Sequence, residues 1–321
     1  MSAEKNSFRS PVIAYAFNDN LRKHIAAHWS KPTIIDYTKD RKPWDIPPEA
    51  DLLMSFHAGW TEAPAQAPAG WPFNLRQIQI LTAGVDKYPD WAINAVPTIC
   101  GRGVSAVPIA EYAVTAMIAY DKKWTQLAAM KKGDPNPDML RISNRSVGLV
   151  GVGAIGREVA VRASAFGMKV RGYTRSGRAP EGVPVEMVGS LAELMAVSDH
   201  VLIATPLTPE TTGMIDASVL AAAKPGLHLI NVARGEIVDQ DALLKALDNG
   251  SIGFATLDVT APEPLPDGHP LERHPNVLIT PHISWLTEEN FDRLTDKVMD
   301  DLDRYARGEP PVNVVDPSAK Y

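Results

Sequence analysis

The segment over 147–156 reads Val-Gly-Leu-Val-Gly-Val-Gly-Ala-Ile-Gly, and its last six residues have glycines at the first, third and sixth positions. In a dinucleotide-binding turn, these glycines permit a tight turn, admit a pyrophosphate close to the backbone, and let helix and strand pack closely. The N-terminus of the following helix then faces the anion. An apolar run precedes the turn and an amphipathic pattern follows it, so a flexible turn without a ligand is the weaker alternative. The residues predicted to contact the dinucleotide here are Gly151, Gly153, Ala154, Ile155 and Gly156.

The end of the next strand decides which dinucleotide is favoured. An NAD site places an acid there, which accepts a hydrogen bond from the ribose 2′-hydroxyl. This chain has no acid between Glu158 and Glu181; two arginines and a serine follow the strand instead. Such side chains can hold a 2′-phosphate by charge-assisted hydrogen bonds, although a solvated basic loop is the alternative. We therefore predict NADP(H), with NAD(H) still possible, and the residues expected to recognise it are Thr174, Arg175, Ser176 and Arg178.

Three charged or titratable side chains each follow a predicted strand further along the chain. They are Arg234 in Asn-Val-Ala-Arg-Gly, Glu263 in a proline-rich loop, and His282 in Thr-Pro-His-Ile. Because ligands of an open α/β sheet bind beyond the carboxyl ends of its strands, these side chains could converge beside a nicotinamide. Taken singly, each has a structural alternative: an arginine in a salt bridge, a solvated glutamate and a core histidine.

In this order after the glycine turn, these segments resemble those of the D-isomer-specific 2-hydroxyacid dehydrogenases. The resemblance covers essentially the whole chain, and its strongest parts are GVGAIG, ATPLTPETTGMI, NVARGEIVD, LDVTAPEPLP and TPHI. The segment over 83–86 is similar to the substrate-binding loop of that family. The resemblance implies hydride transfer between a nicotinamide and C2 of a small 2-oxo or 2-hydroxy acid.

The resemblance also implies a role for each side chain. His282 would be the general acid, since an ordinary histidine titrates near pH ~6.5. Glu263 would fix the imidazole, and Arg234 would bind the substrate carboxylate through its planar fork. Backbone N–H groups of Gly84 and Val85 would complete that carboxylate site. Further cofactor contacts are expected at Thr205, Pro206, Ala233 and Asp258.

The identity of the 2-oxo acid stays open in the sequence. Trp285 and Trp60 could shape the substrate pocket or could simply be packing residues. Glyoxylate and hydroxypyruvate fit the resemblance to NADPH-dependent members, but phenylpyruvate and branched 2-oxo acids are not excluded. Two other functions remain: an enzyme like phosphoglycerate dehydrogenase, and a dinucleotide-sensing binding protein like the corepressors of this family. Formate dehydrogenase is disfavoured, because that relative has Gln at the position of Glu263.

Alternating strand and helix patterns predict an α/β protein with two parallel-sheet domains of Rossmann-like and flavodoxin-like type. The expected strands cover 12–16, 33–37, 51–56, 77–81, 146–150, 169–173, 200–204, 228–232, 254–258 and 277–280. The expected helices cover 19–29, with Asp19 as its cap, and 105–132, 155–166 and 287–307. The family resemblance implies a substrate domain of residues 1–101 plus 288–321, a cofactor domain of residues 102–287, and an active site in the cleft between them.

The composition of the chain disfavours several classes of binding partner. The 321 residues carry a net charge of −6 without long basic runs, which disfavours nucleic acid. The longest apolar stretch, 104–120, contains a proline and a glutamate, so a membrane span is not expected. A single cysteine, Cys100, cannot form a cysteine-rich zinc site, and no metal is expected. The lack of a second cysteine and the lack of a secretory pattern at the N-terminus both fit a cytoplasmic enzyme. The pattern over 105–132 resembles the family's dimerisation arm, which predicts a homodimer; a buried helix is the alternative.

Overall fold

The computed structural model describes residues 8–37, 41–56 and 58–316, and its chain divides into two compact units. The discontinuous unit comprises Met1–Val104 and Thr287–Tyr321, and the inserted unit comprises Ser105–Leu286. Each unit is built on its own parallel sheet, so the predicted fold class is confirmed. Within the part of the chain that the structure describes, no helix combines the length and apolar character needed to cross a membrane. Nor do the same residues include a group of three or more potential metal ligands.

The discontinuous unit contains a five-stranded sheet in the order β2-β1-β3-β4-β5, with every neighbouring pair parallel. Its strands are β1 Val12–Ala16, β2 Thr33–Asp36, β3 Leu52–Ser55, β4 Gln77–Ile80 and β5 Thr98–Ile99. Its helices are α1 Asp19–Ala26, the short 3₁₀ helix η1 Trp60–Glu62, α2 Asp90–Ile93 and α10 Glu288–Arg307. Alternate strand residues enter two different cores, as the period of two of a β-strand requires.

The two faces of this sheet are packed differently. On one face, α1 and α10 supply aliphatic side chains such as Ile25, Leu294 and Val298. On the other face, Trp60 is 1% exposed among the rings of Trp44, Trp71, Tyr88 and Trp91. Its indole nitrogen donates a hydrogen bond of 2.8 Å to the hydroxyl of Ser55. Of the two interpretations left open for Trp60, the structure supports packing.

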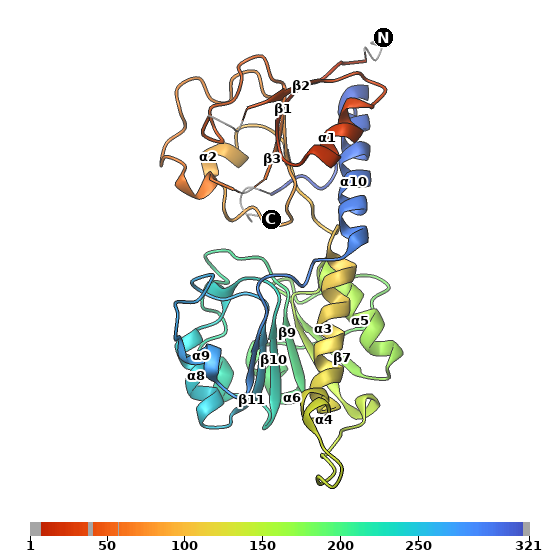
Figure 1. The fold of residues 1–321 in the computed structure, drawn as a ribbon, viewed down its shortest axis with the longest axis vertical. Coiled ribbons are helices and arrows are strands. Elements are labelled where there is room, and N and C mark those ends of the chain that lie inside the picture. The colour runs from red at the N-terminus through yellow and green to blue at the C-terminus, as the bar shows by residue number, and fades with distance from the viewer. Residues whose placement is uncertain (1–7, 38–40, 57, 317–321) are drawn as a thin grey trace. The chain divides into compact units, whose positions relative to one another are not determined.

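The inserted unit contains a seven-stranded parallel sheet in the order β12-β11-β10-β9-β6-β7-β8. Its strands are β6 Ser146–Val150, β7 Lys169–Tyr173, β8 Glu186–Met187, β9 His200–Ile203, β10 Leu227–Asn231, β11 Ile252–Leu257 and β12 Val277–Ile279. Its helices are α3 Ala106–Asp121, α4 Trp124–Ala129, η2 Ile142–Asn144, α5 Ala154–Ala165, α6 Leu191–Val197, α7 Ala217–Ala221, η3 Gly235–Ile237, α8 Gln240–Asp248 and α9 Pro270–Arg273. Figure 1 shows α3 and α5 along one face of this sheet and α8 along the other.

The chain order of these strands creates a switch point beside β6. From β6 the chain continues to β7 and β8 on one side, and it then returns to β9 on the opposite side of β6. Crevices that bind ligands in open α/β sheets lie at such points, beyond the carboxyl ends of the strands. The glycine turn begins directly after β6 and therefore lies at the switch point.

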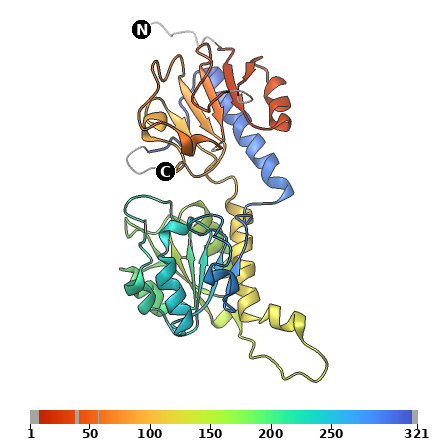
Figure 2. The same cartoon turned by 60° about the vertical axis from the view of Figure 1, so that its left-hand side comes forward.

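The expected helix over 105–132 is wrong in its extent, because the structure contains two helices there. Helix α3 ends at Asp121, and Lys123 adopts a left-handed backbone with φ of 53° before α4 begins. None of the six residues of α4, all of them described, is buried. Figure 2 shows α4 and the following loop leaving the body of the inserted unit. The cap of α1 also differs from the expectation, since Asn18 rather than Asp19 accepts from Leu21 N–H.

Polar side chains are buried at the opposite, amino-terminal edge of the same sheet. His200 and His228 are 0% exposed, and their Nδ1 atoms lie 3.2 Å apart. His200 Nε2 lies 3.1 Å from Asp121 Oδ2, and His228 Nε2 lies 2.9 Å from Thr256 Oγ1. Burial lowers the pKa of His228 well below its usual value, and the charges of His200 and nearby cations add to the effect. His228 is therefore neutral in the folded chain.

This burial makes the free energy of unfolding depend on pH. An unfolded His228 binds a proton below pH ~6.5, whereas the folded side chain does not, so protons favour the unfolded chain. We expect the free energy of unfolding to fall by about 1.4 kcal/mol per pH unit below that value, until the lowered pKa is reached. Denaturant unfolding across this range measures the slope. His228→Gln retains a hydrogen-bonding side chain without the titration and should lose the slope; parallel losses in both proteins would assign it to other groups.

Candidate active site

The glycine turn joins β6 to α5 with two glycines that the protein itself requires. Gly151 has φ of 94°, and a Cβ there would lie 2.7 Å from Ala204 O. A Cβ at Gly156 would lie 2.4 Å from Gly151 O. At Gly153, in contrast, no atom of a described residue lies within 4 Å of such a Cβ. Gly153 therefore faces open space at the N-terminus of α5, where a pyrophosphate can approach the backbone.

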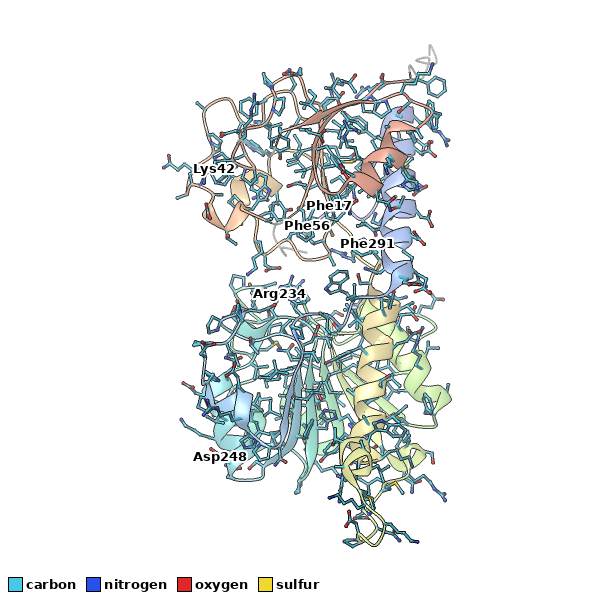
Figure 3. All side chains as sticks on the ribbon, in the orientation of Figure 1. Phe17, Lys42, Phe56, Arg234, Asp248 and Phe291 are labelled. Carbon is cyan, nitrogen blue, oxygen red and sulfur yellow. The ribbon has the colours of Figure 1, made fainter. Side chains whose placement is uncertain are left out.

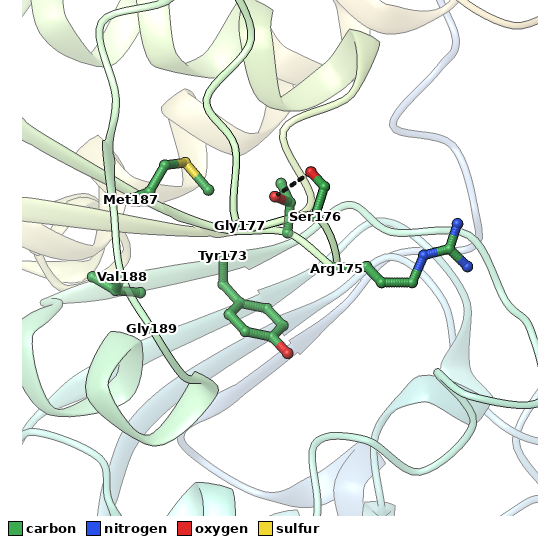
Figure 4. Close-up of a pocket in the computed structure, with 8 residues that line it drawn as sticks. Tyr173, Arg175, Ser176, Gly177, Met187, Val188 and Gly189 are labelled. Atoms are coloured by element: carbon green, nitrogen blue, oxygen red, sulfur yellow. Dashed lines mark hydrogen bonds between the residues drawn. The ribbon is translucent and has the colours of Figure 1, made fainter.

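A cavity of about 440 Å³ lies beyond the carboxyl end of β7 (Figure 4). Its lining consists of Tyr173, Thr174, Arg175, Ser176, Gly177, Met187, Val188 and Gly189. Thr174 Oγ1 and Ser176 Oγ lie 3.4 Å apart, which places both hydroxyls on this loop. Arg178 is not among the lining residues, and its backbone N–H lies 3.4 Å from Ser176 Oγ. The cavity thus has apolar residues on the β8 side and polar or cationic residues on the β7 side.

Arg234 lies in a turn that follows β10, at the carboxyl edge of the sheet (Figure 3). The side chain of Asn231 shapes this turn, because its amide donates to Arg234 O at 2.9 Å and accepts from Ala233 N–H at 3.1 Å. A Cβ on Gly235 would lie 2.0 Å from the carbonyl carbon of Thr260, so the turn packs directly on the loop after β11. The guanidinium donates to Ala233 O at 2.7 Å. Ala233, which we expected to contact the cofactor, therefore accepts from Arg234 through its carbonyl oxygen.

His282 and Glu263 form a close polar pair at this edge. The imidazole Nδ1 lies 2.6 Å from Glu263 Oε1, and the two side chains are 38% and 39% exposed. This hydrogen bond fixes the orientation of the ring and leaves Nε2 to exchange a proton with a bound molecule. The structure thus brings together two residues that are separated in the sequence by α9 and β12.

The backbone of His282 is held by Asp258, which is only 1% exposed. The carboxylate of Asp258 accepts from the Thr280 hydroxyl at 2.6 Å and from the N–H groups of Ile283 and Ser284 at 2.9 and 3.1 Å. His282 N–H also donates to Asp258 O at 2.9 Å. From the sequence, Asp258 was assigned to the cofactor alone. Its contacts with the His282 segment were missed, because no pattern of residue types predicts them.

The remaining predicted residues lie in two places. Thr205 and Pro206 lie just beyond β9, after Ala204, and Trp285 donates from its indole nitrogen to His282 O at 2.8 Å. In the discontinuous unit, Val85 is 2% exposed and packs in the aromatic core. Gly84 O accepts from the Thr82 hydroxyl at 3.0 Å. The role of Gly84 and Val85 as carboxylate donors stays a prediction.

Gln240 is a positioning residue that the sequence gave no reason to select. Its side-chain oxygen accepts from Ala261 N–H at 3.0 Å, and its side-chain nitrogen donates to Ala261 O. It therefore pins the loop that leads from Asp258 to Glu263. The segment NVARGEIVD that was used for the family resemblance ends at Asp239, so no signal in the sequence covered Gln240.

Comparison with known proteins gives consistent matches. Residues 113–284 match the model of the family described as D-isomer specific 2-hydroxyacid dehydrogenase, NAD binding domain. A glycerate dehydrogenase from Methylorubrum extorquens is 32% identical over 257 residues, which cover 76% of this chain and 79% of the relative. A glyoxylate/hydroxypyruvate reductase A from Serratia proteamaculans is 32% identical over 259 residues, covering 75% and 80%.

Among solved structures, similarity extends over nearly the whole chain. A D-isomer specific 2-hydroxyacid dehydrogenase from Xanthobacter autotrophicus, crystallised in complex with NADPH and MES, superposes with a TM-score of 0.81. It is 29% identical in sequence, and the match covers 98% of this chain and 100% of that one. Both units therefore have the fold of that protein.

The contrast between two glycines of the turn predicts two different mutational effects. Gly156→Ala forces a Cβ against Gly151 O, and we expect it to lower the free energy of unfolding by about 1–3 kcal/mol. Gly153→Ala meets open space and an ordinary φ of −79°, so it should fold with unchanged stability but bind a dinucleotide more weakly. Denaturant unfolding and cofactor titration measure the two effects. Equal stabilities of the two variants would contradict the packing argument.

Proposed function

The chain belongs to the D-isomer-specific 2-hydroxyacid dehydrogenases, and we propose that it uses NADPH to reduce a small 2-oxo acid such as glyoxylate or hydroxypyruvate. As a member of that family it is an oxidoreductase that acts on CH–OH groups. The observation that carries the proposal is the 2.6 Å hydrogen bond between His282 and Glu263, on the sheet edge that also bears the glycine turn and Arg234. The names of the glyoxylate/hydroxypyruvate and glycerate relatives support a small substrate.

The residues of the chain would share the chemistry as follows. A bound reduced nicotinamide supplies the hydride that C2 of the 2-oxo acid receives. His282 donates a proton from Nε2 to the carbonyl oxygen, which becomes the hydroxyl of the product. Glu263 keeps Nδ1 engaged, so that Nε2 is the nitrogen presented to the substrate. Arg234 binds the substrate carboxylate through the two-pronged geometry of its guanidinium, which lysine lacks.

The residues after β6 and β7 fit NADPH. The open space at Gly153 suits a pyrophosphate, and the apolar wall formed by Met187 and Val188 suits an adenine ring. Arg175 and Ser176 line the same cavity, and no acid follows β7 before Glu181. Cationic and hydroxyl donors, at the position where an NAD site has an acid, favour a 2′-phosphate over a 2′-hydroxyl. The Xanthobacter autotrophicus structure with NADPH adds support.

We also propose that the chain forms a homodimer through the segment of α3 and α4. Trp124 is 65% exposed in α4, and Met139 in the loop that follows is 50% exposed. A short helix without a buried face gains most of its stability from tertiary or partner contacts. A second copy of the chain would supply that cover.

Replacing Arg175 should weaken the preference for NADPH. Arg175→Ala removes a charge from the lining of the cavity, so kcat/KM with NADPH should fall by about 10-fold or more, as expected for a hydrogen bond to a charged group. The value with NADH should change little. Arg178→Ala is the matched control for the loop, because Arg178 does not line the cavity and its loss should cost less. A wild-type protein with higher kcat/KM for NADH would contradict the proposal.

Replacing His282 should abolish most turnover. With NADPH and a panel of glyoxylate, hydroxypyruvate, phenylpyruvate and a branched 2-oxo acid, the wild-type rates identify the substrate. His282→Ala should then lower kcat by about 10²- to 10⁴-fold while NADPH affinity is retained, because only the proton donor is lost. His24→Ala, on the surface of α1, is the control. Tight NADPH binding without turnover of any acid would instead indicate a dinucleotide-sensing role.

A further inference from the structure

A chain of hydroxyl groups connects α3 to the segment that carries His282. Tyr112 lies on α3, and its hydroxyl is 2.7 Å from Thr280 Oγ1. The Thr280 hydroxyl is in turn 2.6 Å from Asp258 Oδ1. Asp258 is buried, and Tyr112 and Thr280 are half-buried. All three residues belong to the inserted unit, so the chain of contacts lies within one compact body.

The chemistry of the three groups fixes the direction of each hydrogen bond. An ionised carboxylate only accepts, so Thr280 must give its single hydroxyl proton to Asp258. Thr280 can then only accept from Tyr112, which makes Tyr112 the donor. Burial raises the pKa of Tyr112 above its usual value, so the phenol keeps its proton. The result is a relay of two hydrogen bonds, in which Tyr112 donates to Thr280 and Thr280 donates to Asp258.

The carboxylate at the end of this relay organises the residues on either side of the imidazole. His282 has φ of 52°, a left-handed backbone that is strained for a non-glycine residue and persists only where neighbours enforce it. The enforcing contacts are the N–H groups of Ile283 and Ser284 on the Asp258 carboxylate. His282 N–H adds bonds of 2.9 Å to both Asp258 O and Thr280 O. A displaced carboxylate would let this backbone relax and move the ring.

We propose that Tyr112 and Thr280 are positioning residues, which hold the Asp258 carboxylate so that the backbone of His282 presents its imidazole for proton transfer. The inference rests on the proposed role of His282 as the general acid. Glu263 orients the ring from its Nδ1 side, whereas the relay sets the backbone from which the ring projects. The two supports act at different atoms, since neither Tyr112 nor Thr280 contacts Glu263 in any described hydrogen bond.

The test combines kinetics with amide exchange. Thr280→Val should lower kcat by about 10-fold, the size of a lost hydrogen bond to a charged group, and Tyr112→Phe by about 3-fold. NADPH affinity and substrate KM should change far less than kcat. The double variant should be no slower than Thr280→Val alone, because a Tyr112 hydroxyl without Thr280 has no acceptor in the relay. Additive effects would remove Tyr112 from the relay.

Hydrogen–deuterium exchange measures directly how well the backbone N–H groups of the His282 segment are protected. In the cofactor-free chain, residues 281–286 should exchange faster in Thr280→Val than in the wild type. Thr280→Ser, which keeps the hydroxyl, should restore both exchange and kcat. Tyr120→Phe is the matched control, because this tyrosine lies on the same helix but donates to Gly226 O.

The outcomes separate the two proposals. Unchanged exchange and unchanged kcat in Thr280→Val would overturn the relay. If the wild type turns over no 2-oxo acid, the proposed function fails, while the exchange rates still decide whether the relay holds the His282 segment.

Discussion

The carboxylate of Asp258 is almost completely buried, and a buried charge costs several kcal/mol unless hydrogen bonds replace its water. Three donors do so: the hydroxyl of Thr280 and the N–H groups of Ile283 and Ser284. Two of these donors come from the backbone that follows His282, so satisfying the charge also fixes that backbone. The charge therefore sets the position of the imidazole, and the 2.6 Å contact with Glu263 depends on it.

The parallel sheet explains why such distant residues can meet. All seven strands of the inserted unit end at one edge, where the turns after β10, β11 and β12 are neighbours and β9 separates them from the turn after β6. The opposite edge carries the buried network of Asp121, His200 and His228. The polar groups of that network are buried in contact with one another, whereas His282 and Glu263 remain partly exposed. The same sheet thus separates an edge that stabilises the unit from an edge that is open to ligands.

Much of the architecture was predictable from residue patterns. Apolar runs predicted both ends of β1, β6 and β7 correctly, and the glycine spacing located the switch point. The strands β5 and β8 were missed, because two residues each are too few to show a period. The break before α4 was missed as well, since Lys123 carries no helix-breaking chemistry and only the folded chain holds it left-handed. The contacts of Asp258 depend on backbone N–H groups, which no side-chain pattern reports.

The loops at the carboxyl edge of the sheet pack on one another. The geometry of the site therefore depends on how these loops pack and not on single side chains alone. The turn that carries Arg234 is shaped by Asn231 and packs through Gly235 on the backbone of Thr260. Gln240 pins the next residue of that loop, and Asp258 at its start holds the segment of His282. A Cβ at Gly235 would push on the Thr260 loop, which also leads to Glu263. Because each loop is positioned by the loop next to it, a substitution at Gly235 would displace the imidazole of His282 without contacting it.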